Sequence, residues 1–345
     1  MARRGGGRHG MTQLGFGGPR RLAMELLGWA GAPRVSRAGK AGEVCVIGHR
    51  GAPCQAPENT IASFEEALRQ GADAIEADIC VTRDREFLLW HDANPDEKLS
   101  LARQSGAEKL LVVPDVPDAG SPWRKPVREL DLAAMRAHYG YLPREGSEKS
   151  ERRLPFDLLR DLFRWSAKAH GLRRVYLDIK LAEDQVEEAR LLFEKVREHL
   201  RGGPRDRGPS FHLMSIHREI VLALLEAVRR EPRGRIAVYA DFERPGVLHF
   251  APRIGARCIG MGRRGRFQPS YRSEIARVIA ACRAGKLTSV VAWTINDEKK
   301  LRALLRMGAP AIMTDEIERL RRLARRRAPT GKTERSAARR AAARR

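Results

Sequence analysis

Between residues 44 and 313 the chain alternates short apolar runs with longer amphipathic stretches. The run Ala72–Cys80 is almost continuously apolar, as strands of a buried parallel sheet are, whereas Glu58–Gln70 repeats its apolar residues with helical spacing. Counting gives about eight strand-helix units, and their spacing suits right-handed parallel crossovers. We therefore predict the α/β class and a (β/α)8 TIM barrel over residues 43–318, a fold that typically takes about 250 residues.

The alternation stops between residues 93 and 153. Prolines punctuate this stretch, and helical character is confined to Leu130–His138. Loops of this length in compact domains are usually functional or separately folded. We interpret the stretch as an insertion of about sixty residues after the second strand region.

Charged and imidazole side chains follow several of the predicted strands. Glu76 and Asp78 are two residues apart on one strand, so their side chains share one face. Two like charges this close repel each other unless a cation lies between them or one takes a proton, and a divalent metal ion is the simplest resolution. In eightfold barrels the working residues sit at the C-terminal ends of the strands. The sequence places the following candidates there: His49, Glu76, Asp78, His91, Asp178, Lys180 and Trp293.

Several motifs between residues 44 and 318 resemble those of a known family. The segment 44–92 carries, in order, His49-Arg50-Gly51, Pro57-Glu58-Asn59-Thr60, Gly71-Ala72-Asp73, Ile75-Glu76-Ala77-Asp78, Thr82, Asp84 and His91-Asp92. Later motifs are Leu177-Asp178-Ile179-Lys180, Trp293-Thr294-Ile295-Asn296-Asp297 and the run 308–315. Together they resemble the glycerophosphodiester phosphodiesterases over about residues 44–318, and so many ordered matches are far more specific than a single glycine motif.

The resemblance implies a metal-dependent hydrolase of lipid and glycerol metabolism, which releases glycerol 3-phosphate and an alcohol from glycerophosphodiesters. It implies that a glycerol hydroxyl attacks the phosphorus first and that water then opens a cyclic phosphate. His49 and His91 would be the acid/base pair, because imidazole titrates near neutral pH. Glu76, Asp78 and Asp178 would hold Mg²⁺ or Ca²⁺, the cations that carboxylate oxygens suit.

The remaining site residues follow from the same resemblance. Arg50 and Lys180 would hold the non-bridging phosphate oxygens, and Trp293 would offer an apolar wall to the substrate. Glu58 and Asn59 would brace the loop of His49. The chain departs from the family in two places. Asp178 stands where the family usually has glutamate, which leaves the metal open, and ANPDEKLSLARQSGAE replaces a threonine-rich run, which leaves the substrate open.

The net charge of +23 belongs mainly to the two ends of the chain. Residues 1–42 carry +7 and residues 319–345 carry +11, which leaves +5 for the middle. We expect a disordered N-terminal extension and a basic Arg/Ala-rich tail, which could contact nucleic acid or anionic membrane weakly. Two alternatives stay open: lysophospholipase D-type activity, and a non-catalytic barrel that binds through its basic ends.

We expect a cytoplasmic protein. Five cysteines without a C-x-x-C pair argue against a disulfide framework. No run approaches the roughly 18 apolar residues that a membrane-spanning helix needs, so no transmembrane segment is expected. The Arg-rich start lacks a secretory pattern. It resembles a transit peptide loosely, and an extension upstream of a start at Met11 or Met24 is an equal alternative.

Overall fold

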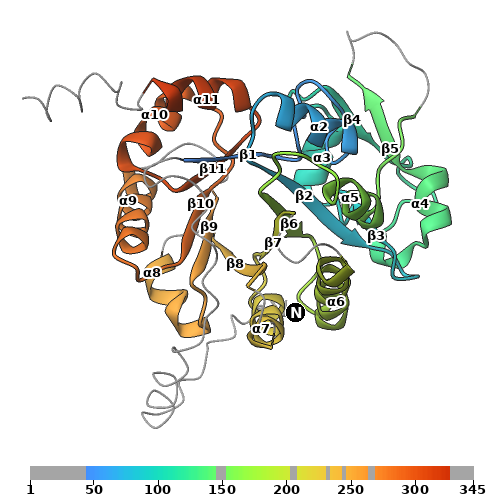
Figure 1. Ribbon diagram of the computed structural model, residues 1–345. Coiled ribbons are helices and arrows are strands. Elements are labelled where there is room, and N and C mark those ends of the chain that lie inside the picture. Colours follow the sequence, from blue (N-terminus) through green and yellow to red (C-terminus); the bar gives the residue numbers. More distant parts are fainter. Residues whose placement is uncertain are drawn as a thin grey trace, which may run out of the picture. The chain divides into compact units, whose positions relative to one another are not determined.

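The computed structural model describes residues 44–144, 153–202, 208–230, 234–242, 246–262 and 269–326 (Figure 1). The predicted extension at residues 1–42 and the end of the predicted tail from residue 327 lie outside the described residues. None of the helices in the described ranges is long and apolar enough to cross a membrane.

Within the described residues, eight parallel strands close into a barrel, which confirms the predicted fold class. Neighbouring strands pair in sequence order, and β1 closes the ring by pairing with both β2 and β11. The strands are β1 (Cys45–Gly48), β2 (Ala74–Val81), β6 (Arg174–Ile179), β7 (Ser210–Ser215), β8 (Ile236–Phe242), β9 (Cys258–Met261), β10 (Ser289–Ala292) and β11 (Ala311–Thr314).

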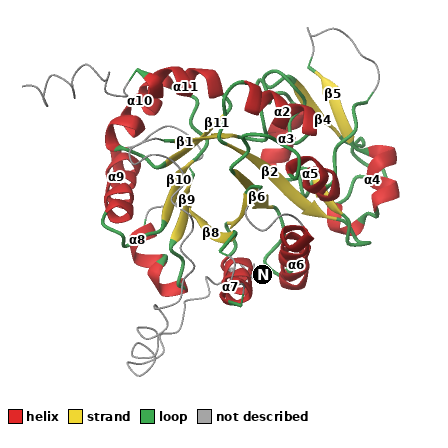
Figure 2. Cartoon of the chain, in the orientation of Figure 1, coloured by secondary structure: helices red, strands yellow, loops and turns green. Residues whose placement is uncertain are grey.

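Helices follow the strands and cover the outside of the barrel (Figure 2). The first begins after Thr60, whose hydroxyl caps the helix by accepting a hydrogen bond from the amide of Ser63. Glu58 and Asn59, which we had placed in this helix or beside it, therefore stay in the preceding loop and can turn toward the barrel mouth. The outer helices are α2 (Ile61–Arg69), α5 (Leu159–Ser166), α6 (Val186–Gly202), α7 (Arg218–Arg229), α8 (Val247–Phe250) with the 3₁₀ turn η3 (Pro252–Ile254), α9 (Pro269–Arg283), α10 (Glu298–Met307) and α11 (Ile317–Arg325).

The strand β3 (Phe87–Leu89) lies outside the ring of parallel strands. We expected this run to be a strand that ends at a common mouth with the others. It is antiparallel to β2, with Ile79 paired to Leu89 and Val81 to Phe87. The end of β2, Cys80 and Val81, thus extends past its pairing with β6 as a hairpin arm, and β3 returns along it. The return brings His91 back beside Asp78, whose carbonyl accepts a hydrogen bond from the amide of Trp90 at 3.1 Å.

The inserted segment is folded and has an apolar core of its own. It contains α3 (Lys98–Gln104), β4 (Val112–Asp115), the 3₁₀ turn η2 (Val127–Glu129), α4 (Leu132–His138) and β5 (Gly140–Pro143). The sequence indicated only α4, because α3 and the antiparallel β4–β5 pair are short and lack a repeating apolar pattern. Trp90 joins this core to the hairpin arm, with Tyr141 and Phe156 packed around its ring. The insertion is therefore anchored at the side of the site that carries His91.

The predicted tail begins too early, because α11 continues to Arg325. Leu320 and Leu323 point into the barrel's outer apolar layer and are buried, although arginines surround them in sequence. Arg321 reaches back to the β1–β2 side, with its guanidinium 2.5 Å from Asp73. Seven of the residues assigned to the tail, 319–325, therefore belong to the last helix of the barrel.

We expect Leu320→Ala to lower the free energy of unfolding by about 2–5 kcal/mol, the usual range for a large-to-small change at a buried leucine. The measurement is chemical denaturation of the purified chain. Arg322→Ala, an exposed change two residues away on the same helix, is the matched control and should stay within about 0.5 kcal/mol of wild type. Equal, small effects of both changes would show that α11 is not packed on the barrel.

Candidate active site

The candidate site residues lie on the inward face of the barrel strands. Side chains two apart on a strand point the same way, so each inward position continues the one before it. Near the bottom of the barrel these positions are apolar and fill the interior, as Ala74, Tyr176, Tyr239, Val291 and Met313 do. Two residues further along each strand or its following loop, the same face becomes polar. That step places Glu76, Asp178, Asp241, Trp293 and Asp315 at the mouth.

Three carboxylates meet at the mouth and could hold a metal ion. Glu76, Asp78 and Asp178 each offer an oxygen, and these oxygens all lie within 4.8 Å of one another. Burial, and then the charge of Asp78, raise the pKa of Glu76 to about 8. Among the described residues, no hydrogen-bond partner meets the buried Oε1 of Glu76. An unsatisfied buried oxygen in a group of carboxylates fits a divalent cation with oxygen ligands.

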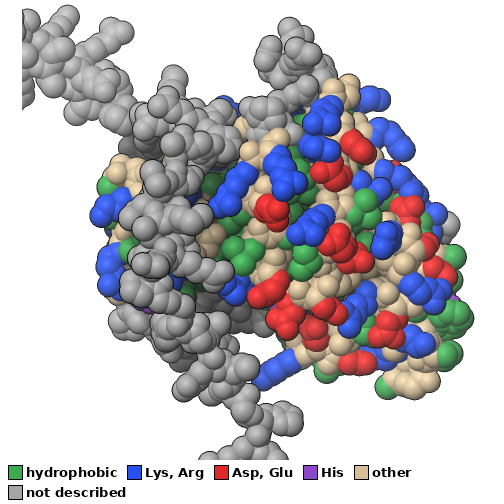
Figure 3. Space-filling model, turned by 90° about the horizontal axis from the view of Figure 1, so that it is seen from below, with side chains coloured by type: hydrophobic (Ala, Val, Ile, Leu, Met, Phe, Trp, Pro, Cys, Tyr) green, Lys and Arg blue, Asp and Glu red, His purple; other side chains and the backbone are tan. Residues whose placement is uncertain are grey.

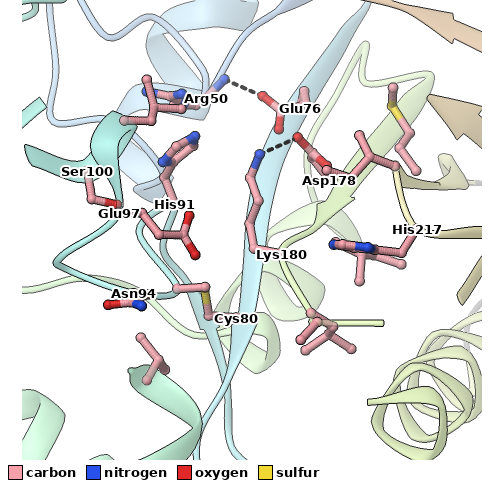
Figure 4. A pocket seen from close by; sticks show the side chains of 18 of the residues that line it. Arg50, Glu76, Cys80, His91, Asn94, Glu97, Ser100, Asp178, Lys180 and His217 are labelled. Carbon is pink, nitrogen blue, oxygen red and sulfur yellow. Dashed lines mark hydrogen bonds and ion pairs between the residues drawn. The ribbon is translucent and has the colours of Figure 1, made fainter. Parts of the chain in front are cut away.

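Lys180 lies between two of these carboxylates. Its Nζ is 2.6 Å from Asp178 and 3.1 Å from Asp78 (Figure 4). Burial favours the neutral amine, but Asp178 and Asp78 outweigh it and hold the pKa of Lys180 above its usual value. Lys180, with His91 and Arg50, in turn holds the pKa of Asp78 well below its usual range, against the effect of burial. The cluster therefore contains a permanent positive charge beside an ionised Asp78.

His49 is oriented by a carboxylate that follows the strand next to its own. Its Nδ1 is 2.7 Å from Oδ1 of Asp315, which follows β11. Asn296 fixes that carboxylate: its amide donates to Asp315, and its carbonyl oxygen accepts from the Asp315 backbone at 2.9 Å. Burial and Arg50 oppose protonation, but Asp315 and Glu76 hold the pKa of His49 above its usual value. Because Nδ1 is engaged, Nε2 is the nitrogen that can exchange a proton with a ligand.

His91 has a carboxylate partner too, but the opposite bias. Its Nδ1 is 2.8 Å from Oδ1 of the adjacent Asp92, a buried residue. Burial and then Arg50 lower the pKa of His91 below its usual value, although Asp78 acts in the other direction. Two imidazoles with pKa values moved apart are suited to opposite roles, one as acid and one as base.

Arg50 lies among carboxylates rather than reaching out as the open clamp that we expected. Its Nη1 is 2.9 Å from both Glu58 and Glu108, and its Nε is 2.9 Å from Asp78. Its backbone amide donates to Glu76 at 2.8 Å. The guanidinium therefore holds Asp78 of the cluster together with Glu58 and Glu108. The backbone amide of the same residue holds Glu76, a second carboxylate of the cluster.

Glu58 and Asn59 both contact the site from the loop before α2. Asn59 forms two hydrogen bonds with Asp78, from its amide to the carboxylate at 2.9 Å and from the Asp78 backbone amide to its carbonyl at 3.0 Å. The Asn59 backbone amide also donates to the carbonyl of Arg50 at 3.1 Å. Both Asn59 and Arg50 have a positive φ, 56° and 52°, so the loop is held in a conformation that side chains other than glycine adopt rarely.

Sequence reasoning gave no site role to six of these residues. Asp92, Asn296 and Asp315 entered only as parts of motifs, and Arg103, Glu108 and Asp241 were not singled out. Asp241 is buried, and its Oδ1 accepts a hydrogen bond from the indole of Trp293 at 3.2 Å. Burial, then Asp178, raise the pKa of Asp241 well above its usual range. A signal existed for it, because an acidic residue stands near the C-terminal end of the apolar strand β8, where the working residues of a barrel sit.

A cavity of about 930 Å³ opens over these groups. Its lining includes His49 and, as Figure 4 shows, Glu76, His91, Asp178 and Lys180. Apolar side chains of the inserted segment and of the loops after β6 and β7 also line the cavity. They include Leu99, Leu110, Pro126, Val127, Leu181 and Ile216. The site can thus accommodate an anion at one end and a second, less polar portion of a ligand at the other.

Comparison with known proteins finds a family model that matches part of the chain. Residues 49–209 match the model of the "Glycerophosphoryl diester phosphodiesterase family". A glycerophosphodiester phosphodiesterase of Caldanaerobacter subterraneus subsp. tengcongensis is 47% identical over 51 residues, which are 15% of this chain and 21% of that relative. The chain thus spans only about a fifth of the length of the first curated relatives it matches.

Solved structures extend the likeness over most of the described chain. A glycerophosphodiester phosphodiesterase from Parabacteroides distasonis superposes with a TM-score of 0.60 at 15% identity, covering 83% of this chain and 98% of that one. An Oleispira antarctica phosphodiesterase, solved in complex with sn-glycerol-3-phosphate as product, gives a TM-score of 0.59 at 20% identity, with 81% and 96% covered. At these identities the structures show a shared fold.

Proposed function

We propose that this chain is a member of the glycerophosphoryl diester phosphodiesterase family, whose model matches residues 49–209, and that it hydrolyses glycerophosphodiesters to glycerol 3-phosphate and an alcohol. One observation carries the proposal. Two carboxylate-bound imidazoles with opposite pKa shifts face one cavity together with three clustered carboxylates and a lysine. Hydrolysis of an anionic diester needs charge neutralisation, a base for the nucleophile and an acid for the leaving group, and this set contains all three.

Glu76, Asp78 and Asp178 would hold a divalent cation, Mg²⁺ or Ca²⁺ by ligand type. When bound, such an ion neutralises charge on the phosphoryl group and favours the ionised form of a nearby hydroxyl. Lys180 adds a fixed positive charge for a non-bridging oxygen. Arg50 acts in this proposal mainly through the carboxylates that it holds.

His91 and His49 divide the proton transfers between them. His91, whose pKa is lowered, is neutral and accepts the proton of the glycerol hydroxyl that attacks phosphorus. His49, whose pKa is raised, is protonated and donates to the alcohol oxygen as its bond to phosphorus breaks. A cyclic phosphate forms, and water opens it with the two roles exchanged. Trp293 lies beside the carboxylates and would form a wall for the glycerol portion.

The apolar side of the cavity favours a second candidate within the same chemistry. Leu99, Leu110 and Val127 of the inserted segment line the same cavity as Ile216 of the β7 loop, and these apolar side chains could take an acyl chain. Lysophospholipase D-type hydrolysis of a lysophospholipid is therefore the alternative substrate class. The comparison of a glycerophosphodiester with its lysophospholipid distinguishes the two.

The non-catalytic alternative receives little support from the described surface. In the coloured part of Figure 3, Lys and Arg side chains are interspersed with Asp and Glu. Several form ion pairs, such as Arg190 with Glu187 and Arg230 with Glu226. The cytoplasmic location stays a prediction. A contact of the basic tail with nucleic acid or anionic membrane also stays a prediction, and it is tested by truncating the chain after residue 326, which leaves α11 intact.

We expect glycerol 3-phosphate and choline to appear from glycerophosphocholine in the presence of Mg²⁺ or Ca²⁺. A matched diester in which ethanol replaces glycerol should react at least about 100-fold more slowly, because it has no neighbouring hydroxyl to attack. Both rates are measured by enzymatic detection of choline. Release from lysophosphatidylcholine alone would select the alternative substrate class, and release from none of these diesters with either metal would overturn the proposal.

A further inference from the structure

We infer that Arg103 of the inserted segment is a positioning residue for this site, which orients His91 through Asp92 and Arg50 through Glu58. The inference rests on the proposed function for its catalytic consequence, but the contacts that carry it are independent of the substrate. Helix α3 of the insertion lines the cavity at Ser100 (Figure 4). The contacts of Arg103 connect this helix to Asp92, beside His91, and to Glu58, beside Arg50.

Arg103 lies about one helical turn after Ser100 on α3 and contacts the carboxylates next to the catalytic residues. Its side chain is 2% exposed, and its Nε donates to both oxygens of Asp92 at 3.1 and 3.2 Å. Oδ1 of Asp92 is also the atom that lies 2.8 Å from Nδ1 of His91. One arginine thus fixes the carboxylate that fixes the imidazole, and it leaves Nε2 of His91 as the proton-exchanging nitrogen.

The other end of the same guanidinium completes a ring of alternating charges. Nη2 of Arg103 pairs with Glu58 and Nη1 pairs with Glu108, while Nη1 of Arg50 pairs with the same two glutamates at 2.9 Å. The ring Arg50–Glu58–Arg103–Glu108 is therefore closed. The two arginines also match outside the ring: Nε of Arg50 faces Asp78, and Nε of Arg103 faces Asp92.

Only a guanidinium can fill this place. It presents several N–H donors in a planar fork, so it can bind Asp92, Glu58 and Glu108 at once. A lysine carries its charge on one flexible point and cannot hold three carboxylates in fixed directions. Without the arginine, buried Asp92 and Glu58 each lose a positive partner, and such carboxylates move, take up water or take up a proton. In each case Asp92 no longer holds His91 in one tautomer.

The test compares two variants of Arg103 with a matched control in the same insertion. Arg103→Met should lower kcat for glycerophosphocholine by about 10–100-fold, the usual cost of losing a residue that orients a functional side chain, with KM changed by less than about threefold. Arg103→Lys, which keeps the charge, should restore stability but recover kcat only in part. The control is Arg124→Met, because the Arg124 side chain is 11% exposed and its hydrogen bonds and ion pairs within the described residues are with Asp96, Gln104 and backbone carbonyls of the insertion.

A second measurement reads the position of His91 without turnover. The ¹⁵N shifts of its ring, assigned by comparison with His91→Gln, should report a single tautomer protonated at Nδ1 in wild type and in Arg124→Met. They should report a mixture in both Arg103 variants. Unchanged kcat and ring shifts in Arg103→Lys would overturn the inference, and so would an equal loss of kcat in Arg124→Met. A wild-type chain without activity would overturn the proposed function, and the ring shifts would still decide whether Arg103 positions His91.

Discussion

Asparagine in place of either His49 or His91 should lower kcat for glycerophosphocholine by about 10²–10⁴-fold, the usual contribution of a positioned general acid or base. Asparagine keeps a polar group near Asp315 or Asp92 but cannot exchange a proton near neutral pH. The fold should survive, because neither histidine belongs to the apolar layers of the barrel. Steady-state release of choline is the measurement.

The pH profile distinguishes the two histidines. His91 must be neutral to accept a proton, and its lowered pKa places the acidic limb of the profile below its ordinary value of 6.5. His49 must be protonated to donate, and its raised pKa places the alkaline limb above 6.5. We therefore expect a bell-shaped kcat/KM with a plateau around neutral pH. Loss of the acidic limb in His91→Asn, and of the alkaline limb in His49→Asn, would assign the roles.

A control separates chemistry from folding. His199 is a partly buried histidine on α6, stacked on Phe163 and remote from the cavity lining. His199→Asn should leave kcat near the wild-type value, because this ring does not line the cavity. If all three variants lose turnover equally, the loss does not come from acid/base catalysis. If His49→Asn and His91→Asn both retain it, the proposed mechanism is wrong.

The barrel could be predicted because about eight apolar runs alternate with amphipathic stretches, and its mouth because side chains two apart on a strand share one face. Glu76, Asp78 and Asp178 each interrupt an otherwise apolar strand, and parallel strands bring such positions to one edge. The register of the sheet shows the result directly, with Asp78 and Asp178 as paired residues on neighbouring strands. A pattern in single strands was therefore enough to identify a cluster across strands.

Arg103 and Glu108 could not be found in this way. They lie in or just after a seven-residue helix in a segment without apolar periodicity, and a charged residue there is usually solvated. Their contacts with Arg50 and Glu58 depend on how the insertion folds back over the mouth, which local sequence does not encode. Glu108 illustrates the effect. Its side chain is 32% exposed, yet the two arginines, acting against burial, lower its pKa to about 2.

Removal of divalent cations should abolish turnover, and the carboxylate cluster predicts how the loss depends on each residue. Glu76→Gln and Asp178→Asn should each weaken Mg²⁺ or Ca²⁺ binding by at least about 10-fold, because a neutral amide replaces one of three charged oxygen ligands. The measurement is the rise in melting temperature with added metal in chelator-treated protein, which reports binding without catalysis. Asp184→Asn is the matched control, since this exposed aspartate only pairs with Arg128 at the surface.

The same cluster makes metal binding depend on pH in a definite direction. Without a cation, Glu76 has a pKa of about 8 and is largely protonated at neutral pH, so a metal ion must displace that proton to use its carboxylate. Affinity should therefore rise as the pH increases toward 8 and then level off, and each ion bound near pH 7 should release close to one proton. Glu76→Gln has no proton to release, so its weaker metal binding should lose most of this pH dependence.

Equal pH dependence in wild type and Glu76→Gln would mean that another group, such as the buried Asp241, carries the displaced proton. The proposal that the reaction depends on a metal ion would survive that result, but Glu76 would no longer be the ligand that sets the pH dependence of metal binding.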